Sequence, residues 1–146
     1  MKIAALLLFA FLMPLFLPRA AMVHAQQKPE DLAQKSAEAW LALTDSGKYA
    51  ESWDQASASF KAAVSKDNWV GMVSSVRGPL SALQSRKLAT ARFVKNPPHA
   101  PEGEYVILRY DTSFEKLPSA VETVSMTLDK DGSWRAAGYF VTPPSQ

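Results

Sequence analysis

The sequence predicts an α+β domain in which N-terminal helices pack on a curved, four-stranded antiparallel sheet. Apolar residues recur at helical spacing as far as Pro79 and alternate with polar residues after it. The second half holds four successive strand candidates with short connections, which is typical of an antiparallel meander. One face of such a sheet must be covered, and the N-terminal helices are the elements available to cover it. A chain of 146 residues has room for one such domain.

The first 25 residues have the composition of an export signal. Lys2 supplies a positive charge, residues 3–17 are apolar apart from one proline, and residues 23–25 offer small side chains for cleavage. The alternative is an uncleaved membrane anchor, but the apolar run is shorter than the roughly 18 residues that a spanning helix needs. We expect cleavage after Ala25 and an extracytoplasmic, periplasmic location. The mature domain is then residues 26–146, with no stable membrane span.

Removal of this segment makes the chain formally neutral. Lys2 and Arg19 leave with it, so the 16 basic residues become 14, against 14 acidic ones. The remaining basic residues form no stripe that would bind phosphates, and we expect no nucleic-acid partner. The chain has no cysteine, which excludes a disulfide framework, a thiolate zinc site, a catalytic cysteine and a lipid-anchored cysteine. Removing 25 of 146 residues leaves 121, enough to bury a core without disulfides.

The first helix is predicted to begin at Pro29, where a proline and two acidic residues suit the positive end of the helix dipole. Its apolar stripe includes Trp40, and Gly47 is a suitable left-handed cap after its end. Three further helices are expected over residues 49–53, 57–64 and 68–76, the last capped by Asp67 and ended by Arg77-Gly78-Pro79.

The strands are predicted over residues 83–95, 104–114, 120–128 and 133–141. Strict alternation in the first strand places Leu88 and Val94 on one face, and Ala89, Ala91 and Phe93 on the other. In the third strand it places Val124, Met126 and Leu128 on one face. The sequence Asp129-Lys130-Asp131-Gly132 predicts a hairpin turn before the last strand.

Known catalytic and cofactor motifs are missing from the sequence. It contains no glycine-rich phosphate loop and no nucleophile elbow. His99 is the one histidine of the mature chain, so a metal site would need carboxylates alone. Residues 129–132 resemble the start of a calcium loop, but no acidic partner follows at the required distance. We therefore expect no metal, no cofactor and no assigned catalytic residue.

Asp111 is the carboxylate with the best claim to a functional role. It stands in an apolar and aromatic strand, on the face opposite Tyr110. If burial raised its pKa, it could act as a general base with Tyr110 or Tyr139. The alternative, which we favour, is a cross-strand ion pair with an arginine; the candidates are Arg86, Arg92 and Arg135.

Two arginines and one tryptophan complete the candidate ligand-binding residues. Arg77 stands at a helix end and Arg86 near the start of a long strand, where both could grip a carboxylate or a polar ligand. Alternatively, they tie the helices to the sheet, and Arg77 bonds the terminal carbonyls of its helix. Trp134 opens the last strand and is either an exposed aromatic contact or part of the core.

Ten short segments, distributed from about Leu32 to Val141, are similar to the bacterial family DUF4019, a domain of unknown function. They are Trp40, Gly47-Lys48-Tyr49, Ser52-Trp53, Phe60, Trp69, Arg77-Gly78-Pro79-Leu80, Ser85-Arg86, Gly103-Glu104-Tyr105, Thr112-Ser113-Phe114 and Asp131-Gly132-Ser133-Trp134-Arg135-Ala136-Ala137-Gly138-Tyr139. The resemblance implies an exported domain, and it implies no particular biochemical activity. The element order also resembles cone-shaped folds, NTF2-like or cystatin-like, in which a bent sheet and helices enclose a pocket.

These observations predict an exported, non-catalytic module that binds a small ligand or an envelope protein. One alternative is a small cofactor-free enzyme that uses Asp111 with a pocket tyrosine. Another is a homodimer that buries the outer face of the sheet, because apolar side chains interrupt that face. They are Tyr105, Ile107, Val121 and Thr123.

Overall fold

The computed structural model describes residues 27–144, and the predicted export signal with its cleavage site lies outside them. The elements are α1 (Pro29–Asp45), α2 (Tyr49–Asp54), α3 (Ala58–Ala63), α4 (Lys66–Arg77), a 3-10 turn (Gly78–Leu80), β1 (Leu83–Lys95), β2 (Glu104–Phe114), β3 (Leu117–Leu128) and β4 (Trp134–Thr142). No helix within the described range is long and apolar enough to cross a membrane. The predicted order of helices and strands is confirmed, with β3 beginning three residues earlier than expected.

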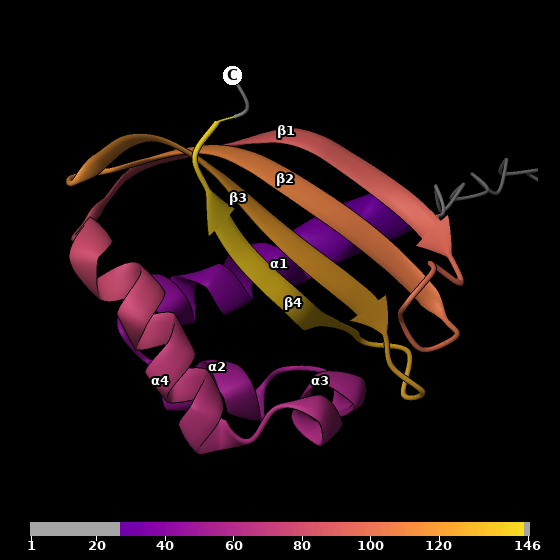
Figure 1. The fold of residues 1–146 in the computed structure, drawn as a ribbon. Coiled ribbons are helices and arrows are strands. Elements are labelled where there is room, and N and C mark those ends of the chain that lie inside the picture. The colour runs from indigo at the N-terminus through magenta and orange to yellow at the C-terminus, as the bar shows by residue number, and fades with distance from the viewer. Residues whose placement is uncertain (1–26, 145–146) are drawn as a thin grey trace, which may run out of the picture.

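The sheet is an open antiparallel meander in the order β1-β2-β3-β4. It curves over α1, which crosses its concave face, while α2, α3 and α4 lie together on the side of β4 (Figure 1). The predicted α+β class is therefore confirmed, and β1 and β4 are the two edges of a sheet that does not close.

Local sequence explains where the helices begin and end. Gly47 adopts the left-handed conformation after α1, with φ of 71°, as its position predicted. Ser57 and Ser65 cap α3 and α4, since their hydroxyl oxygens accept hydrogen bonds from the backbone three residues later at 3.1 and 3.3 Å. The prediction that Asp67 caps the fourth helix is wrong: Asp67 lies in the first turn of α4, where its charge suits the dipole.

A bulge in β1 changes which residues share a face. The pairing with β2 shifts between Leu88 and Thr90, so Leu88 pairs with Tyr110 and Ala91 with Leu108. Leu88 and Ala91 therefore both contact the core. The extra residue reverses the alternation, and the prediction that Leu88 and Val94 share a face is wrong.

The core lies between the concave face of the sheet and the helices. β2 alternates as predicted, with Leu108 and Tyr110 buried and Arg109 and Asp111 exposed. Trp40, Trp69 and Tyr139 form an aromatic group whose ring centres lie 5.6–6.5 Å apart. These contacts hold β4 against α1 and α4.

Candidate functional site

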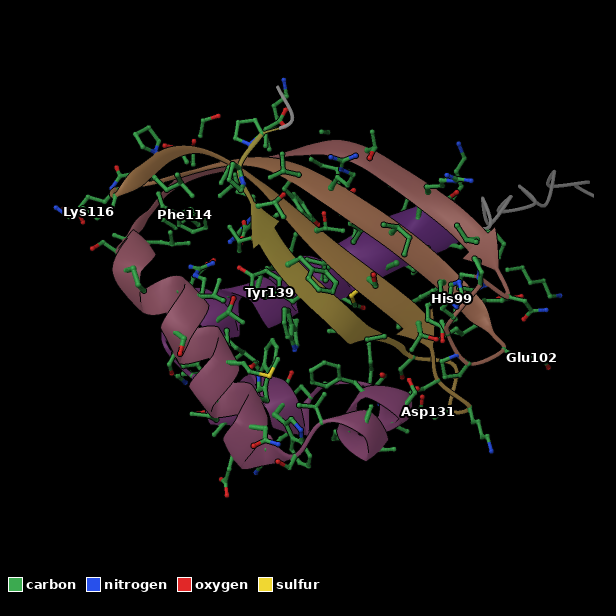
Figure 2. All side chains as sticks on the ribbon, viewed as in Figure 1. His99, Glu102, Phe114, Lys116, Asp131 and Tyr139 are labelled. Carbon is green, nitrogen blue, oxygen red and sulfur yellow. The ribbon has the colours of Figure 1, made fainter. Side chains whose placement is uncertain are left out.

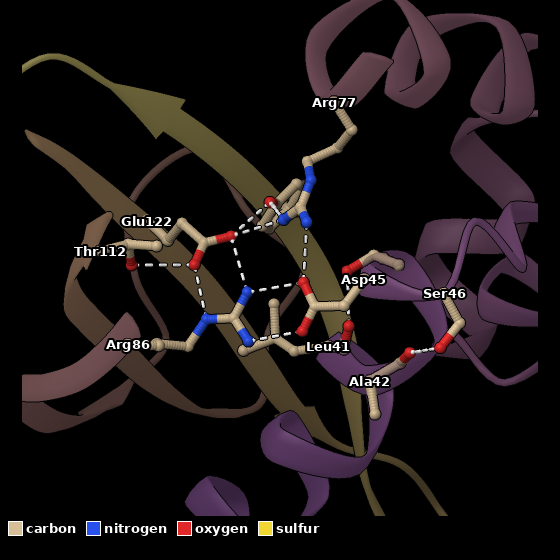
Figure 3. A network of polar contacts seen from close by, with 10 residues as sticks. Leu41, Ala42, Asp45, Ser46, Arg77, Arg86, Thr112 and Glu122 are labelled. Carbon is tan, nitrogen blue, oxygen red and sulfur yellow. Dashed lines mark hydrogen bonds and ion pairs between the residues drawn. The ribbon is translucent and has the colours of Figure 1, made fainter. Parts of the chain in front are cut away.

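A group of buried polar residues, which we name the charge network, lies where α1 and α4 end against the sheet (Figure 3). Its members are Asp45 of α1, Arg77 of α4, Arg86 of β1, Thr112 of β2, Glu122 of β3 and Tyr139 of β4. Each of the four strands and both long helices thus supply one side chain. The sequence predictions included the two arginines and the tyrosine.

The two arginines of the network share the same two carboxylates. Arg86 donates to both oxygens of Asp45 at 2.7 and 2.9 Å, and its Nε donates to Glu122 at 2.6 Å. Arg77 donates to Asp45 at 2.7 Å and to Glu122 at 3.0 Å. Two cations therefore face two anions, and the network carries no net charge.

Glu122 is the most enclosed member of the network, with no exposed surface. Besides the arginines, it accepts hydrogen bonds from Thr112 at 2.9 Å and from Tyr139 at 2.5 Å. The Tyr139 hydroxyl in turn accepts from Arg77 at 2.9 Å. Both oxygens of Glu122 are thus occupied by donors, which a buried carboxylate requires.

The electrostatics of the network favour the charged forms of its ion pairs. Burial alone would raise the pKa of Asp45, but hydrogen bonds and the charge of Arg86, followed by those of Arg77, lower it below its ordinary value. Burial alone would lower the pKa of Arg86, but the bonds to Asp45 and Glu122 raise it. Burial and then the neighbouring Glu122 charge raise the pKa of Tyr139, which stays protonated.

This arrangement matches the tie between helices and sheet that was the alternative for Arg77 and Arg86. The donors of both arginines point at carboxylates of the chain itself and at the Tyr139 hydroxyl, except the Arg77 Nε, which is buried without a partner in residues 27–144. Within these residues Arg77 makes no hydrogen bond to the terminal carbonyls of α4, so that part of the alternative is wrong. Neither arginine lines a cleft described below. A ligand could bind these guanidinium groups only by displacing Asp45 or Glu122.

Tyr110 and Asp111 lie on opposite faces of the sheet. Tyr110 is buried, its hydroxyl finds no partner in the described residues, and burial raises its pKa to about 12. Asp111 is exposed on the outer face, opposite Lys87 and Val121. The proposed pair of Asp111 with Tyr110 or Tyr139 thus has no shared site.

The cross-strand ion pair of Asp111 with an arginine is also wrong. Within residues 27–144, Arg86 pairs with Asp45 and Glu122, and Arg135 pairs with Asp129 and Asp131. Asp111 faces Lys87 in the register of β1 and β2 instead. The bulge after Leu88 and the inward position of Arg86 explain the difference.

Trp134 belongs to the core rather than to an exposed ligand contact, since 8% of its surface is exposed. Its accessible part lines a cleft of about 410 Å³ between α1, α2 and β4. Trp40 and Arg135 line the same cleft. In the residues described, no three His, Asp or Glu side chains come together in a group that could hold a metal ion.

Among residues 27–144, three of the five exposed large hydrophobic side chains lie on α4 and β4. A cleft of about 190 Å³ is lined by Trp69, Met72, Val73, Val76, Tyr139, Phe140 and Val141. It shares four of these residues with a second cleft of about 370 Å³, which extends past Phe60 to the loop that holds His99 and Pro101. We name the two clefts together the apolar groove; Tyr139 lies at its base and His99 at its far end (Figure 2).

The rim of the apolar groove exposes large hydrophobic surfaces. The exposed fractions are 55% for Met72, 45% for Val76 and 63% for Phe140. No Asp, Glu, Lys or Arg lines either cleft. Met72 and Phe140 were not among the candidate residues predicted from the sequence, although Met72 and Val76 are four residues apart on one helix and so share a face.

The comparisons with known proteins establish the family and the fold. The family described as "Protein of unknown function (DUF4019)" matches residues 36–139. A solved structure from Catenulispora acidiphila superposes with a TM-score of 0.51 at 13% identity, over 77% of this chain and 89% of that one, which shows a shared fold. No curated protein matches. Since the match extends over most of the chain, this protein belongs to the DUF4019 family.

Proposed function

We propose that this chain is an exported, non-catalytic module that binds an uncharged, apolar ligand in the apolar groove. The observation that carries the proposal is that Met72 and Val76 of α4, both exposed, face Val141 of the edge strand β4 across one groove. Phe140 lines the groove from the strand edge, and its ring lies beside Gly138 on the other face of the sheet. A contiguous apolar patch on a soluble domain marks an interaction site more often than chance exposure does.

The chemistry of the ligand follows from the lining of the groove. The charged side chains near the concave face are paired within the charge network, so apart from His99 at its far end the groove offers a ligand no ionic partner. A charged group placed there would lose its hydration without compensation. The lining therefore favours ligands without charge on the part that enters.

The size of the groove and the rigidity of its wall also suit a small ligand. The larger cleft, of about 370 Å³, falls in the size range of small-molecule sites, and the cleft of about 190 Å³ that shares four of its residues extends it. The Trp69 ring is held in place, because its Nε1 donates to Ser52 at 2.9 Å and its edge packs on Phe60. A fixed aromatic wall reduces the entropy lost on binding.

Titration with N-phenylnaphthylamine, a neutral fluorescent probe, tests this proposal. Met72→Ala should weaken binding about tenfold, since much of one apolar contact is lost. Phe93→Ala is the control: Phe93 is 36% exposed on the opposite edge strand, and its removal should leave the affinity unchanged. Equal binding by the wild type and Met72→Ala would rule out the groove as the ligand site.

Export is the second part of the proposal, supported by the composition of residues 1–25. Expression of the full chain, followed by the intact mass of the secreted or periplasmic fraction, tests it. The expected product begins at Gln26. A cytoplasmic product of full mass would contradict the proposed export, but it would leave the proposed ligand binding in the groove untouched.

A further inference from the structure

We propose that residues 138–142 of β4 form a docking edge at which an extended, uncharged polypeptide segment adds as a fifth strand. The segment would run along the apolar groove, between β4 and α4. This inference rests on the proposed role of the groove and names its occupant.

The two edge strands differ in how they are protected. β1 carries Lys87, Arg92 and Lys95 and is interrupted by its bulge, and charges and bulges are devices that keep an edge from pairing with another chain. The last half of β4 is Gly138-Tyr139-Phe140-Val141-Thr142, with no charge and no proline. Proline first appears after the strand, at Pro143. The β4 edge thus lacks the protection that β1 has.

The first half of β4 already has a partner on its outer edge. The backbone N–H of Ser57, at the start of α3, donates to the carbonyl of Ala136 at 2.9 Å. Past Ala136, no backbone hydrogen bond from another described element reaches β4 on that side. The edge of β4 is therefore covered by α3 at Ala136 and open at residues 138–142.

The groove beside this edge has the lining that an added strand needs. Trp69, Met72 and Val76 of α4 stand across from Tyr139 and Val141 of β4. Alternate side chains of a strand paired with β4 would point toward these residues, because successive side chains point to opposite faces. Neither the edge nor the groove carries a charge, so the segment should be uncharged with apolar side chains at alternate positions.

The space favours a lone strand over a second folded copy of the chain. α4 stands beside β4 across a cleft of about 190 Å³, which has room for a few side chains. Because α4 lies on the side of β4 (Figure 1), a second copy that paired its own β4 here would need room for its own α4 as well. A single extended segment needs room only for its own side chains.

The test uses the synthetic peptide acetyl-Thr-Val-Thr-Val-Thr-Val-Thr-amide and amide hydrogen exchange of the mature chain. Binding should slow exchange about tenfold at alternate residues among 138–142 and leave β1 unchanged. Two control peptides carry N-methyl groups on one or the other set of alternate amides. Since one edge of the peptide pairs with β4, one control should bind like the parent and the other should not bind.

A variant with the strand fused to the chain tests the same pairing even if the free peptide binds too weakly to be detected. In it, residues 143–146 are replaced by Asn-Gly and the same seven-residue strand, which would fold back along β4 as a hairpin at high effective concentration.

The proposal is overturned if exchange at residues 138–142 stays unprotected in this variant, or if both N-methylated peptides bind like the parent. A chain that binds N-phenylnaphthylamine but shows neither protection nor peptide binding retains the proposed function and loses this inference. If the wild-type chain forms a dimer through residues 138–142, the proposal is also overturned, because the occupant of the edge is then a second copy of the chain.

Discussion

At the scale of single residues, the buried carboxylate of Glu122 dominates the energetics of the charge network. It has no exposed surface and accepts from four other side chains, two of them arginines. Buried ion pairs stabilise a fold weakly relative to an apolar replacement, but removal of one partner leaves a charge buried without compensation. The network is therefore more sensitive to single substitutions than to its complete replacement.

Glu122→Gln should lower the free energy of unfolding by about 3–5 kcal/mol, because Arg77 and Arg86 are left with one anion between them. Urea denaturation measures the change. Asp131→Asn is the control; Asp131 pairs with Arg135 on the surface, and its loss should barely move the midpoint. A midpoint for Glu122→Gln equal to that of the wild type would show that the network does not stabilise the fold.

The two buried tyrosines should respond in opposite ways to loss of the hydroxyl. Tyr139→Phe removes a bond to Glu122 and one from Arg77, and should cost about 1.5–3 kcal/mol. Tyr110→Phe removes a buried hydroxyl without a partner in the described residues and should be neutral or stabilising. Thermal unfolding of both variants compares them, and a destabilised Tyr110→Phe would mean that this hydroxyl is bonded in solution.

Acid should weaken the fold through Asp45. Its pKa in the folded protein lies below the ordinary 3.8, so its contribution is complete above about pH 4 and is lost as the pH falls through the lowered value. The difference in unfolding free energy between the wild type and Asp45→Asn should therefore shrink from pH 7 to pH 2. A difference that stays constant over this range would contradict the role given to the ionised carboxylate.

The charge network also shows what the sequence could reveal of single residues. Arg77, Arg86 and Tyr139 could be chosen by their type and place in the sequence, but their partners Asp45 and Glu122 could not. One signal was present: alternation places Glu122 on the face of Val124 and Met126, where a carboxylate needs a buried cation. Asp45 gave no such signal, because an acid at a helix end is ordinarily solvated.

At the scale of elements, caps and glycines decide where the helices begin and end. Gly71 lies inside α4, and no atom lies within 4 Å of where its side chain would be. Gly47 has a φ of +71° after α1, a conformation that other residues adopt at a cost. The same substitution should therefore have opposite effects at the two positions.

Gly71→Ala should raise the free energy of unfolding by about 0.5–1 kcal/mol, and Gly47→Ala should lower it by about 1 kcal/mol. Guanidinium denaturation of the two variants and the wild type gives both values. A destabilised Gly71→Ala variant would mean that α4 is not a regular helix at this position in the folded protein.

The elements themselves were predictable, and their irregularities were not. Apolar spacing is a local property, so the order of four helices and four strands could be derived from the sequence. The bulge after Leu88 depends on how β1 meets β2, and alternation within one strand cannot reveal it. This one extra residue accounts for the wrong face assignment in β1.

At the scale of the whole molecule, the apolar groove arises from segments distant in the sequence. Met72 and Phe140 belong to α4 and β4, and neither segment alone shows that they approach each other. The fold is shared with a solved structure at 13% identity, which brings no function with it. The homodimer stays a prediction, as do the looser NTF2-like and cystatin-like resemblances. Ile107, Val121 and Thr123 lie half-buried on the outer face of the sheet, whereas Tyr105, the fourth residue of that prediction, is buried and donates its hydroxyl to the Pro101 carbonyl.

The central claim is that this chain binds apolar ligands at α4 and β4, whereas the charge network serves the fold. Amide chemical shifts of ¹⁵N-labelled mature chain, recorded during titration with N-phenylnaphthylamine, test it directly. The shifts should cluster at residues 69–76 and 138–142, with little change at Asp45 and Arg86. Shifts centred on the charge network, or on the cleft beside Trp134, would contradict it.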